Sequence, residues 1–247
     1  MTKGKIQVIF KKEDIKPDLL EGKVAVVFDI LFATSTITAA IAHGAVSVIP
    51  VFSAEQAREK AAQFTQPYLM AGEDRGRTIE GFHPPLHTHI SPLIQGKHLI
   101  LTTTNGTVAL TQANKSANLY ASSLLNNPAM AKHLYQKHKH ETIVLICSGS
   151  SGSYTMEDFY GAGSLISFMQ ELGDWELSDA AATAFHFYES SRSSKQLLTN
   201  CRIGQLLMNY GVDQREIEFA AQEGVFDTVL VYDPEEGQIK EGHYASS

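Results

Sequence analysis

The sequence predicts an α/β protein of three layers, α/β/α, with a mostly parallel or mixed sheet between two layers of helices. Apolar segments of strand length alternate with helical patterns through the first 170 residues of the 247-residue chain, an order typical of parallel βα units. The strand segments are apolar at nearly every position, as in strands buried on both faces, and the last third is rich in helical patterns. We expect one compact unit over residues 1–247, or two lobes, 1–140 and 141–247, with the site between them.

Short runs of valine, isoleucine, leucine and aromatic residues predict the strands. The first run, KIQVIF, alternates as a half-buried strand does, whereas VAVVF and TIVLIC are continuous apolar runs. A polar connection with Pro17 separates the first two strands, and a polar tail follows the last. The predicted strands are residues 5–10, 24–28, 46–51, 68–71, 98–103, 118–121, 142–147 and 225–232.

Start and stop signals delimit the helices. A Ser/Thr cluster at 34–36 begins one helix, which stops near His43 and Gly44. The sequence SAEQ at Ser53 is a capping arrangement, and TMED at Thr155 fits a helix start. The predicted helices are residues 34–43, 53–64, 108–113, 126–138, 155–172, 178–189, 193–198, 204–210 and 213–221.

Residues 74–92 form the irregular part of the chain. Three prolines and two glycines in DRGRTIEGFHPPLHTHISP make a regular element improbable there. Long loops inside compact domains are usually functional or disordered. The large apolar residues of this segment favour an ordered loop.

Composition excludes several classes of partner. The formal net charge of −7 and the lack of a basic run argue against nucleic acid, and no apolar run reaches the roughly 18 residues of a membrane span. Two cysteines, Cys147 and Cys201, give no disulfide framework, and the N-terminus has too short an apolar run for a signal peptide. We expect a cytoplasmic protein that binds a small anionic substrate. Its oligomeric state is left open, with a homodimer as one alternative.

Polar loops follow three of the predicted strands, in VVFD-ILFATST, LILTTT-NGT and VLIC-SGSSGSYTMED. If the strands are parallel, these loops meet at one edge of the sheet, where ligands of α/β proteins gather. Asp29 ends the first of these strands and is placed as a metal ligand or a catalytic acid. The alternative is that it only caps the next helix.

The second loop, TTTNGT at 102–107, is a candidate anion cradle. Gly106 allows close approach of the backbone, the hydroxyls can donate hydrogen bonds, and a helix N-terminus offers N–H groups. The alternative is an Asn-Gly hairpin turn. The helical pattern from Val108 favours the cradle.

Carboxylates occur in two further loops. Glu157 and Asp158 follow the third loop, where one of them could be only a helix cap. Adjacent helical residues point about 100° apart, so both are not expected to bind one ion. Gly72-Glu73-Asp74-Arg75-Gly76-Arg77 combines acidic and basic groups, either as part of a site or as a solvated turn.

His83, His87 and His89 form a pattern that resembles a metal site, HxxxHxH. A proline-rich loop is a poor rigid template for metal ligands. We therefore favour a carboxylate site over a histidine site.

Taken together, these stretches resemble the 2-phosphosulfolactate phosphatase family over almost the whole chain. The matching segments, in order, are DILFATST at 29–36, Gly72-Glu73, Gly81-Phe82, TTTNGT at 102–107, Cys-x-Gly at 147–149, and Glu157-Asp158 with Ala162-Gly163. The resemblance implies an α/β fold and magnesium-dependent hydrolysis of 2-phosphosulfolactate to 3-sulfolactate and phosphate. It also implies a place in coenzyme M or sulfolactate formation.

The chain departs from the usual family pattern in three places. The family usually has arginine at the position of Phe32, G-E-R-G-G at 72–77 and D-L-G-N-S-P at 83–92. The substrate carries phosphate, sulfonate and carboxylate, for which arginine forks are natural clamps. Arg75 or Arg77 could replace the missing fork.

The residues and the resemblance together give a site hypothesis. Asp29, Glu73 and Asp158 are the predicted catalytic residues, and Mg²⁺ is the predicted cofactor because it prefers oxygen ligands. The candidate metal ligands are Asp29, Glu73, Glu157 and Asp158. The candidate substrate-binding residues are Thr34, Ser35, Thr36, Arg75, Arg77, Thr103, Thr104, Asn105, Gly106, Thr107, Ser148 and Gly149.

Two other functions remain open. In the first, Asp29 is itself the nucleophile, as in haloacid-dehalogenase-type phosphatases, although those have a second Asp where this chain has Leu31. In the second, a diverged relative binds an anion or regulates a partner without turnover.

Overall fold

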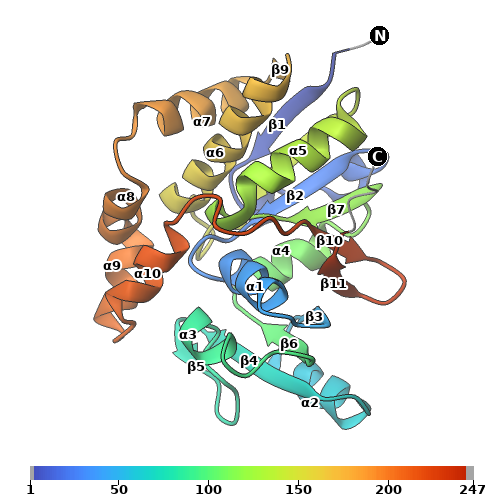
Figure 1. Ribbon diagram of the computed structural model, residues 1–247, viewed down its shortest axis with the longest axis vertical. Coiled ribbons are helices and arrows are strands. Elements are labelled where there is room, and N and C mark those ends of the chain that lie inside the picture. Colours follow the sequence, from blue (N-terminus) through green and yellow to red (C-terminus); the bar gives the residue numbers. More distant parts are fainter. Residues whose placement is uncertain (1–2, 243–247) are drawn as a thin grey trace.

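The computed structural model describes residues 3–242, which contain one mixed sheet of eleven strands. The strands run in the spatial order β5-β4-β6-β3-β11-β10-β7-β2-β8-β1-β9 (Figure 1). Their bounds are β1 Lys5–Ile9, β2 Val24–Phe28, β3 Ser47–Val51, β4 Tyr68–Asp74, β5 Arg77–Thr78, β6 His98–Thr102, β7 Asn118–Ala121, β8 Thr142–Cys147, β9 Glu176–Leu177, β10 Leu230–Asp233 and β11 Gln238–Glu241.

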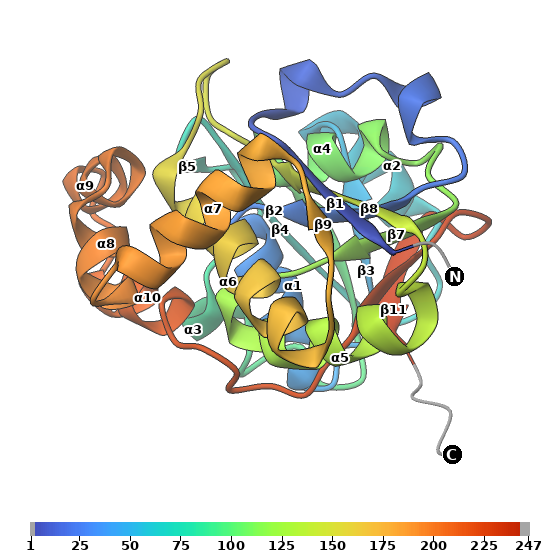
Figure 2. The ribbon, with the colours of Figure 1, turned by 90° about the horizontal axis from the view of Figure 1, so that it is seen from above.

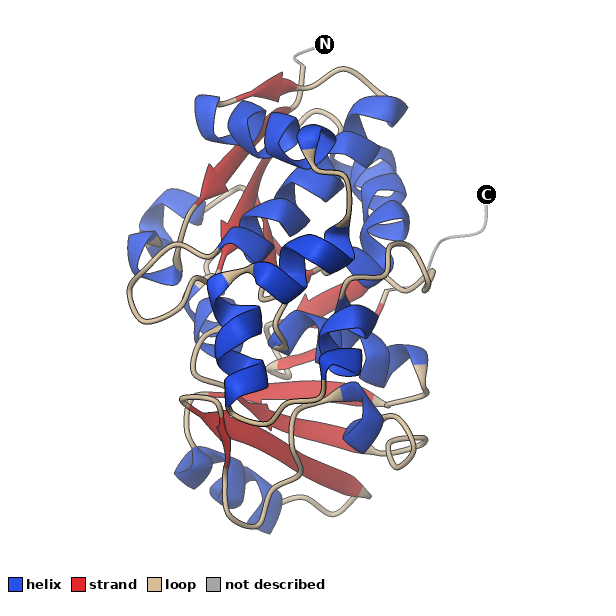
Figure 3. Cartoon of the chain, turned by 90° about the vertical axis from the view of Figure 1, so that its left-hand side faces the viewer, coloured by secondary structure: helices blue, strands red, loops and turns tan. Residues whose placement is uncertain are grey.

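Helices cover both faces of the sheet, so the three-layer α/β/α prediction is confirmed (Figure 3). The α-helices are α1 Ala33–Ala42, α2 Ala54–Ala62, α3 His87–Ile90, α4 Gly106–Gln112, α5 Asn127–His138, α6 Met156–Leu172, α7 Asp179–Ser190, α8 Ser194–Asn200, α9 Arg202–Asn209 and α10 Gln214–Ala220. Short 3₁₀ turns lie at Lys12–Asp14, Pro17–Leu20 and Leu124–Asn126. None of the helices within residues 3–242 combines the length and apolar character of a membrane span.

Strand β2 shows how the sheet separates two hydrophobic cores. All five of its residues are buried. Val24, Val26 and Phe28 pack into the core beneath α5, α6 and α7, whereas Ala25 and Val27 pack into the core that includes α1 and α4. Figure 2 shows α6 and α7 on one side of β1 and β8, and α4 on the other. This follows from the period of two along a strand, and it explains why the run is apolar at every position.

The sheet consists of two parallel sets joined by an antiparallel hairpin. Strands β4, β6 and β3 are parallel to one another, as are β7, β2, β8, β1 and β9. The hairpin β10–β11 lies between the two sets and pairs antiparallel with β7 and with β3. The two parallel sets therefore run in opposite senses.

The carboxyl ends of β2 and β4 nevertheless face one cavity. Neighbouring strands rotate by roughly 20–25°, and the six steps from β2 to β4 accumulate on the order of 120–150°. Twist of this size turns the two opposed sets toward one another. As predicted, the loops after β2, β6 and β8 line one cavity. They meet because the sheet is twisted, and not because all of these strands are parallel.

Several parts of the chain differ from the prediction. Strand β9 was not predicted, and the predicted strand 225–232 is a strand only from Leu230 onward. The polar tail after 232 contains β11, in which Ile239 alone is fully buried, so the apolar signal of a central strand is absent there. The predicted loop 74–92 contains β5 and the short helix α3. It is ordered, as its apolar residues indicated.

The ranges 1–140 and 141–247 interleave within the sheet. Strand β8 lies between β2 and β1, and β10 with β11 lies between β3 and β7. A boundary near residue 140 therefore does not divide the sheet.

Candidate active site

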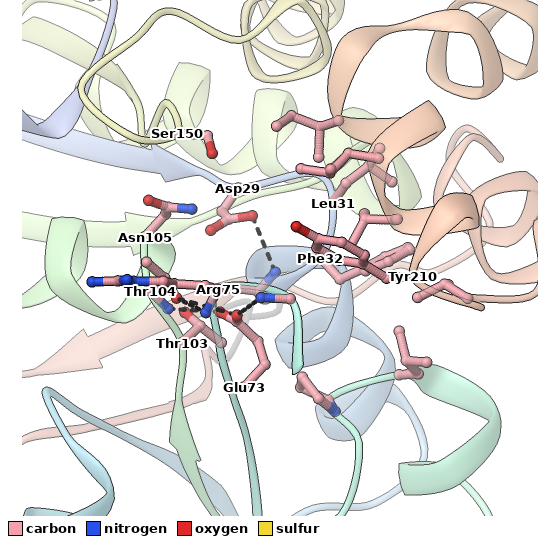
Figure 4. A pocket seen from close by; sticks show the side chains of 18 of the residues that line it. Asp29, Leu31, Phe32, Glu73, Arg75, Thr103, Thr104, Asn105, Ser150 and Tyr210 are labelled. Carbon is pink, nitrogen blue, oxygen red and sulfur yellow. Dashed lines mark hydrogen bonds between the residues drawn. The ribbon is translucent and has the colours of Figure 1, made fainter. Parts of the chain in front are cut away.

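A cavity of about 620 Å³ lies where the carboxyl ends of β2, β4 and β6 face helix α9 (Figure 4). One wall is polar and the opposite wall is apolar or aromatic. The polar lining residues are Asp29, Glu73, Arg75, Thr78, Thr103, Thr104, Asn105, Ser150 and Ser151. The apolar and aromatic ones are Leu31, Phe32, Pro84, Pro85, Leu86, Ile203, Leu206, Leu207, Tyr210 and Val212.

Asp29 lies directly after β2 and is buried in the polar wall. Its Oδ1 accepts a hydrogen bond from the Ala33 N–H at 3.3 Å, and the Gly106 N–H also donates to its carboxylate. Position 106 requires glycine, because a Cβ there would lie 2.7 Å from Asp29 Oδ2 and 2.4 Å from Ala33 Cβ. Burial, and then the charges of Asp158 and Glu73, raise the pKa of Asp29 to about 8. A cation beside this carboxylate would offset both causes.

Glu73 projects into the same cavity from the end of β4 (Figure 4). Its Oε1 accepts a hydrogen bond from the Thr104 N–H at 2.7 Å. Its Oε2 accepts one from the Gly76 N–H at 2.7 Å and one from the Thr104 hydroxyl at 3.1 Å. These donors hold the carboxylate in place before any ligand arrives.

Strands β4 and β5 form an antiparallel hairpin in which Glu73 pairs with Thr78, and Arg75 and Gly76 are the two residues of its turn. Both turn residues have positive φ, 50° and 81°, as a type I′ hairpin turn requires. The turn brings Arg75 to the cavity, and Arg75 makes no ion pair within residues 3–242. The segment 72–77 is therefore both a charged turn and part of the cavity lining.

Arg77 is exposed and lines a neighbouring cavity of about 920 Å³, which adjoins the first at Gly76, Thr78 and Tyr210. Of the two predicted arginines, the structure thus places Arg75 in the candidate site and Arg77 next to it.

The TTTNGT loop holds carboxylates with its backbone. Thr103 and Thr107 each donate their N–H to the hydroxyl of the other, at 3.1 and 3.2 Å. The N–H groups of Thr104 and Gly106 donate to Glu73 and Asp29. Helix α4 follows the loop, so the hairpin alternative is wrong. The cradle that we predicted for an anion is occupied by the protein's own carboxylates, and Thr103, Thr104 and Asn105 line the cavity.

Asp158 lies behind the cavity wall. Its Oδ1 accepts a hydrogen bond from the Ile30 N–H at 2.9 Å, and its Oδ2 accepts from the Gly149 N–H at 3.0 Å and the Thr155 hydroxyl at 2.7 Å. Burial and the charge of Glu157 raise its pKa. Its contacts tie the loop after β2 to the loop after β8, which is a positioning role.

Glu157 points toward the start of α9, where Cys201 is its hydrogen-bond partner. Burial raises its pKa, and the charge of Asp29 adds to the effect. It does not line the cavity.

Ser148 and Gly149 are buried, and the cavity meets the next two residues of their loop, Ser150 and Ser151. The Ser/Gly loop therefore reaches the site two residues later than we predicted.

The 34–36 cluster is part of the fold beneath the site. Its hydroxyls donate to backbone carbonyl oxygens: Thr34 to Asp29 at 3.0 Å, Ser35 to Ile30 at 2.8 Å and Thr36 to Pro85 at 2.6 Å. All three side chains are buried, and none lines the cavity.

The histidines do not assemble a metal site. His87 Nδ1 lies 2.5 Å from Glu216 Oε2, and its ring stacks on Phe219 with centroids 3.6 Å apart. His83 is half-buried and His89 exposed. Within residues 3–242, no group of three or more His, Cys, Asp or Glu residues is arranged to hold a metal ion.

Magnesium fits a smaller donor set than the four carboxylates we predicted. It is commonly held by one or two carboxylates together with waters and phosphate oxygens of the substrate. Asp29 and Glu73 are two such carboxylates on one cavity wall (Figure 4). Glu157 and Asp158 are turned to other partners.

The apolar wall was not predicted as part of the site. Ile203, Leu206, Leu207 and Tyr210 recur at helical spacing on and just after α9, and all four line the cavity. The spacing was visible in the sequence. What was missing was any sign of which cavity this helix faces.

Comparison with known proteins agrees with these observations. The family model described as 2-phosphosulpholactate phosphatase matches residues 9–235. A protein of Clostridium perfringens (strain SM101 / Type A), named probable 2-phosphosulfolactate phosphatase, is 36% identical over 242 residues, which cover 96% of each chain. Proteins of the same name from Clostridium acetobutylicum and Carboxydothermus hydrogenoformans are 31% and 36% identical, covering 92% and 96% of this chain and 97% and 95% of their own. The chain belongs to the 2-phosphosulfolactate phosphatase family, a family of phosphoric monoester hydrolases.

Proposed function

We propose that this protein is a magnesium-dependent phosphatase that hydrolyses 2-phosphosulfolactate, or a related small phosphorylated acid, to the hydroxy acid and phosphate. The observation that carries the proposal is the polar wall, where Asp29, Glu73 and Arg75 meet in one cavity. A phosphate dianion would be repelled by two carboxylates alone. A divalent cation held by these carboxylates would offset the repulsion, and Arg75 adds a further positive charge.

The chain's own residues have distinct tasks in this mechanism. Asp29 and Glu73 would hold the ion at the polar wall, each already oriented by backbone N–H groups. When bound, Mg²⁺ supplies positive charge against the transferring phosphoryl group. The guanidinium of Arg75 would bind the phosphoryl oxygens by charge-assisted hydrogen bonds. Asp158 would keep Asp29 in place through the Ile30 N–H.

The two other functions receive less support. Phosphatases of the haloacid-dehalogenase type have a second Asp two residues after the nucleophile, and here that position is Leu31, which lines the cavity. A non-catalytic role would leave the oriented pair of carboxylates without a purpose.

The test measures phosphate release from 2-phosphosulfolactate with magnesium and with chelator, for the wild type, Asp29→Asn and Asp174→Asn. Asp174 is a matched control, because its side chain is 86% exposed and lines neither cavity. We expect turnover that needs magnesium, is lost in Asp29→Asn and is kept in Asp174→Asn. Turnover without metal and a trapped aspartyl phosphate would favour the nucleophile mechanism. Binding without turnover would favour a non-catalytic relative.

A further inference from the structure

The wall opposite the carboxylates bears on the part of the substrate that is not phosphate. Resting on the proposed function, which includes related phosphorylated acids, we infer that this wall favours an apolar substituent, such as an aryl or branched alkyl group, over a second strong acid. The preferred substrate class is thus a phosphorylated acid with an apolar side group.

Several side chains of the wall are large and apolar or aromatic, yet they remain partly exposed to solvent. Leu206 and Tyr210 on the α9 side are 37% and 51% exposed. Phe32 lies between Asp29 and Tyr210 and belongs to the same wall (Figure 4). Apolar side chains left partly exposed around a concave site are typical of ligand contacts. An apolar substituent would cover them when bound.

The charge of the cavity leads to the same conclusion. Among the described residues that line it, Arg75 alone carries a permanent positive charge. Lys12 lies nearby, but its Nζ is bound to Asn105 Oδ1 at 2.8 Å and to Glu13 at 3.1 Å. A sulfonate at the apolar wall would lose part of its hydration without meeting a cation in exchange, which is costly.

The adjoining cavity contains basic side chains, but most of them already have partners. Arg215 pairs with Asp213 at 2.5 Å, and His87 binds Glu216. Arg77 is exposed there without an ion pair among residues 3–242. It is the group that a long acidic substituent would meet, and it provides a direct test of the opposite hypothesis.

The experiment compares two esters that differ only in this substituent, 2-phosphosulfolactate and the 2-phosphate of 3-phenyllactate. One methylene in an apolar pocket changes kcat/KM by about 10- to 200-fold. We therefore expect the phenyl ester to be preferred at least tenfold in kcat/KM. Phosphorylated lactate, which has neither group, provides the reference rate.

Two variants probe the wall. Phe32→Arg and Leu206→Arg should each reverse the preference, raising kcat/KM for the sulfonate ester relative to the phenyl ester at least tenfold. Leu93→Arg is the control, because Leu93 is 42% exposed and lines neither cavity. It should leave the ratio unchanged.

The inference and the proposed function can fail separately. Preference for the sulfonate ester, with a selective loss in Arg77→Ala, would overturn the inference while leaving the phosphatase intact. Binding of both esters is measured by calorimetry in parallel. No phosphate release together with tenfold tighter binding of the phenyl ester would refute the proposed function alone, and equal binding would refute the inference.

Discussion

Replacing Asp29 with Asn should abolish activity and at the same time stabilise the fold. At pH 7 this carboxyl is ionised in the unfolded chain, where its pKa is 3.8, and largely protonated in the folded one, where its pKa is about 8. At 1.36 kcal/mol for each pH unit between 3.8 and 7, the difference costs the wild type about 4 kcal/mol. Asn keeps an acceptor for the Ala33 N–H but presents an NH₂ group near the Gly106 N–H, a mismatch of about 1–3 kcal/mol. The net gain should be about 1–3 kcal/mol.

The sign of the pH dependence is fixed by the direction of the shift. The stability contributed by protonated Asp29 is fully present below pH 3.8 and is lost as the pH rises to about 8. The advantage of Asp29→Asn should therefore be absent near pH 4 and largest at pH 8. Urea denaturation at pH 4, 6 and 8 in the presence of chelator measures it, with Asp174→Asn as the control.

Magnesium adds a second readout to the same experiment. A ligand that binds only the folded state stabilises it by mass action, so added Mg²⁺ should raise the wild-type midpoint and leave that of Asp29→Asn unchanged. Equal stability of the two proteins at pH 8 would refute the reasoning, since Asp29 would then ionise in the fold without penalty. An advantage that persists undiminished at pH 4 would refute it too.

Three further perturbations follow from other contacts. Gly106→Ala should lower the free energy of unfolding by about 1–3 kcal/mol and remove most of the activity, because the new Cβ would lie 2.7 Å from Asp29 Oδ2. Thermal unfolding and a phosphate-release assay measure these effects. A variant as stable and as active as the wild type would contradict the close contact between Gly106 and Asp29. Burial raises the pKa of Glu216, but hydrogen bonds from His87 and Thr88 outweigh it and lower the pKa below 4.5, so the stability lost in Glu216→Gln should be seen above pH 4.5 and vanish as the wild type is acidified below it. Burial raises the pKa of the Cys147 thiol well above its usual range, so mass spectrometry after brief treatment with a thiol reagent should find it unmodified in the folded protein and modified in urea.

The fold was largely predictable because its strong elements have strong local patterns. The buried runs VAVVF and TIVLIC became β2 and β8, at residues 24–28 and 142–147 as predicted. Strand β11 was missed because a single buried side chain, Ile239, gives no run. Its place in the sheet is set by pairing with β10, which the sequence pattern does not report.

The site was predictable where chemistry and position coincide. Asp29 and Arg75 directly follow β2 and β4, Glu73 lies near the end of β4, and the structure brings all three to one cavity. The roles of neighbours were harder to foresee, because they depend on hydrogen-bond direction. Asp158 accepts backbone N–H groups behind the wall, and no pattern in the sequence distinguishes that from a carboxylate facing the ligand.

The hairpin of β10 and β11 has a consequence for how the protein is made. It joins the strand set that carries Asp29 to the set that carries Glu73, yet it comes from residues 230–241. During synthesis, the two strand sets that form the candidate active site therefore have no sheet hydrogen bonds between them until residues 230–241 leave the ribosome. A stalled or shortened nascent chain would then contain both Asp29 and Glu73 but lack the β10–β11 hairpin that joins their strand sets.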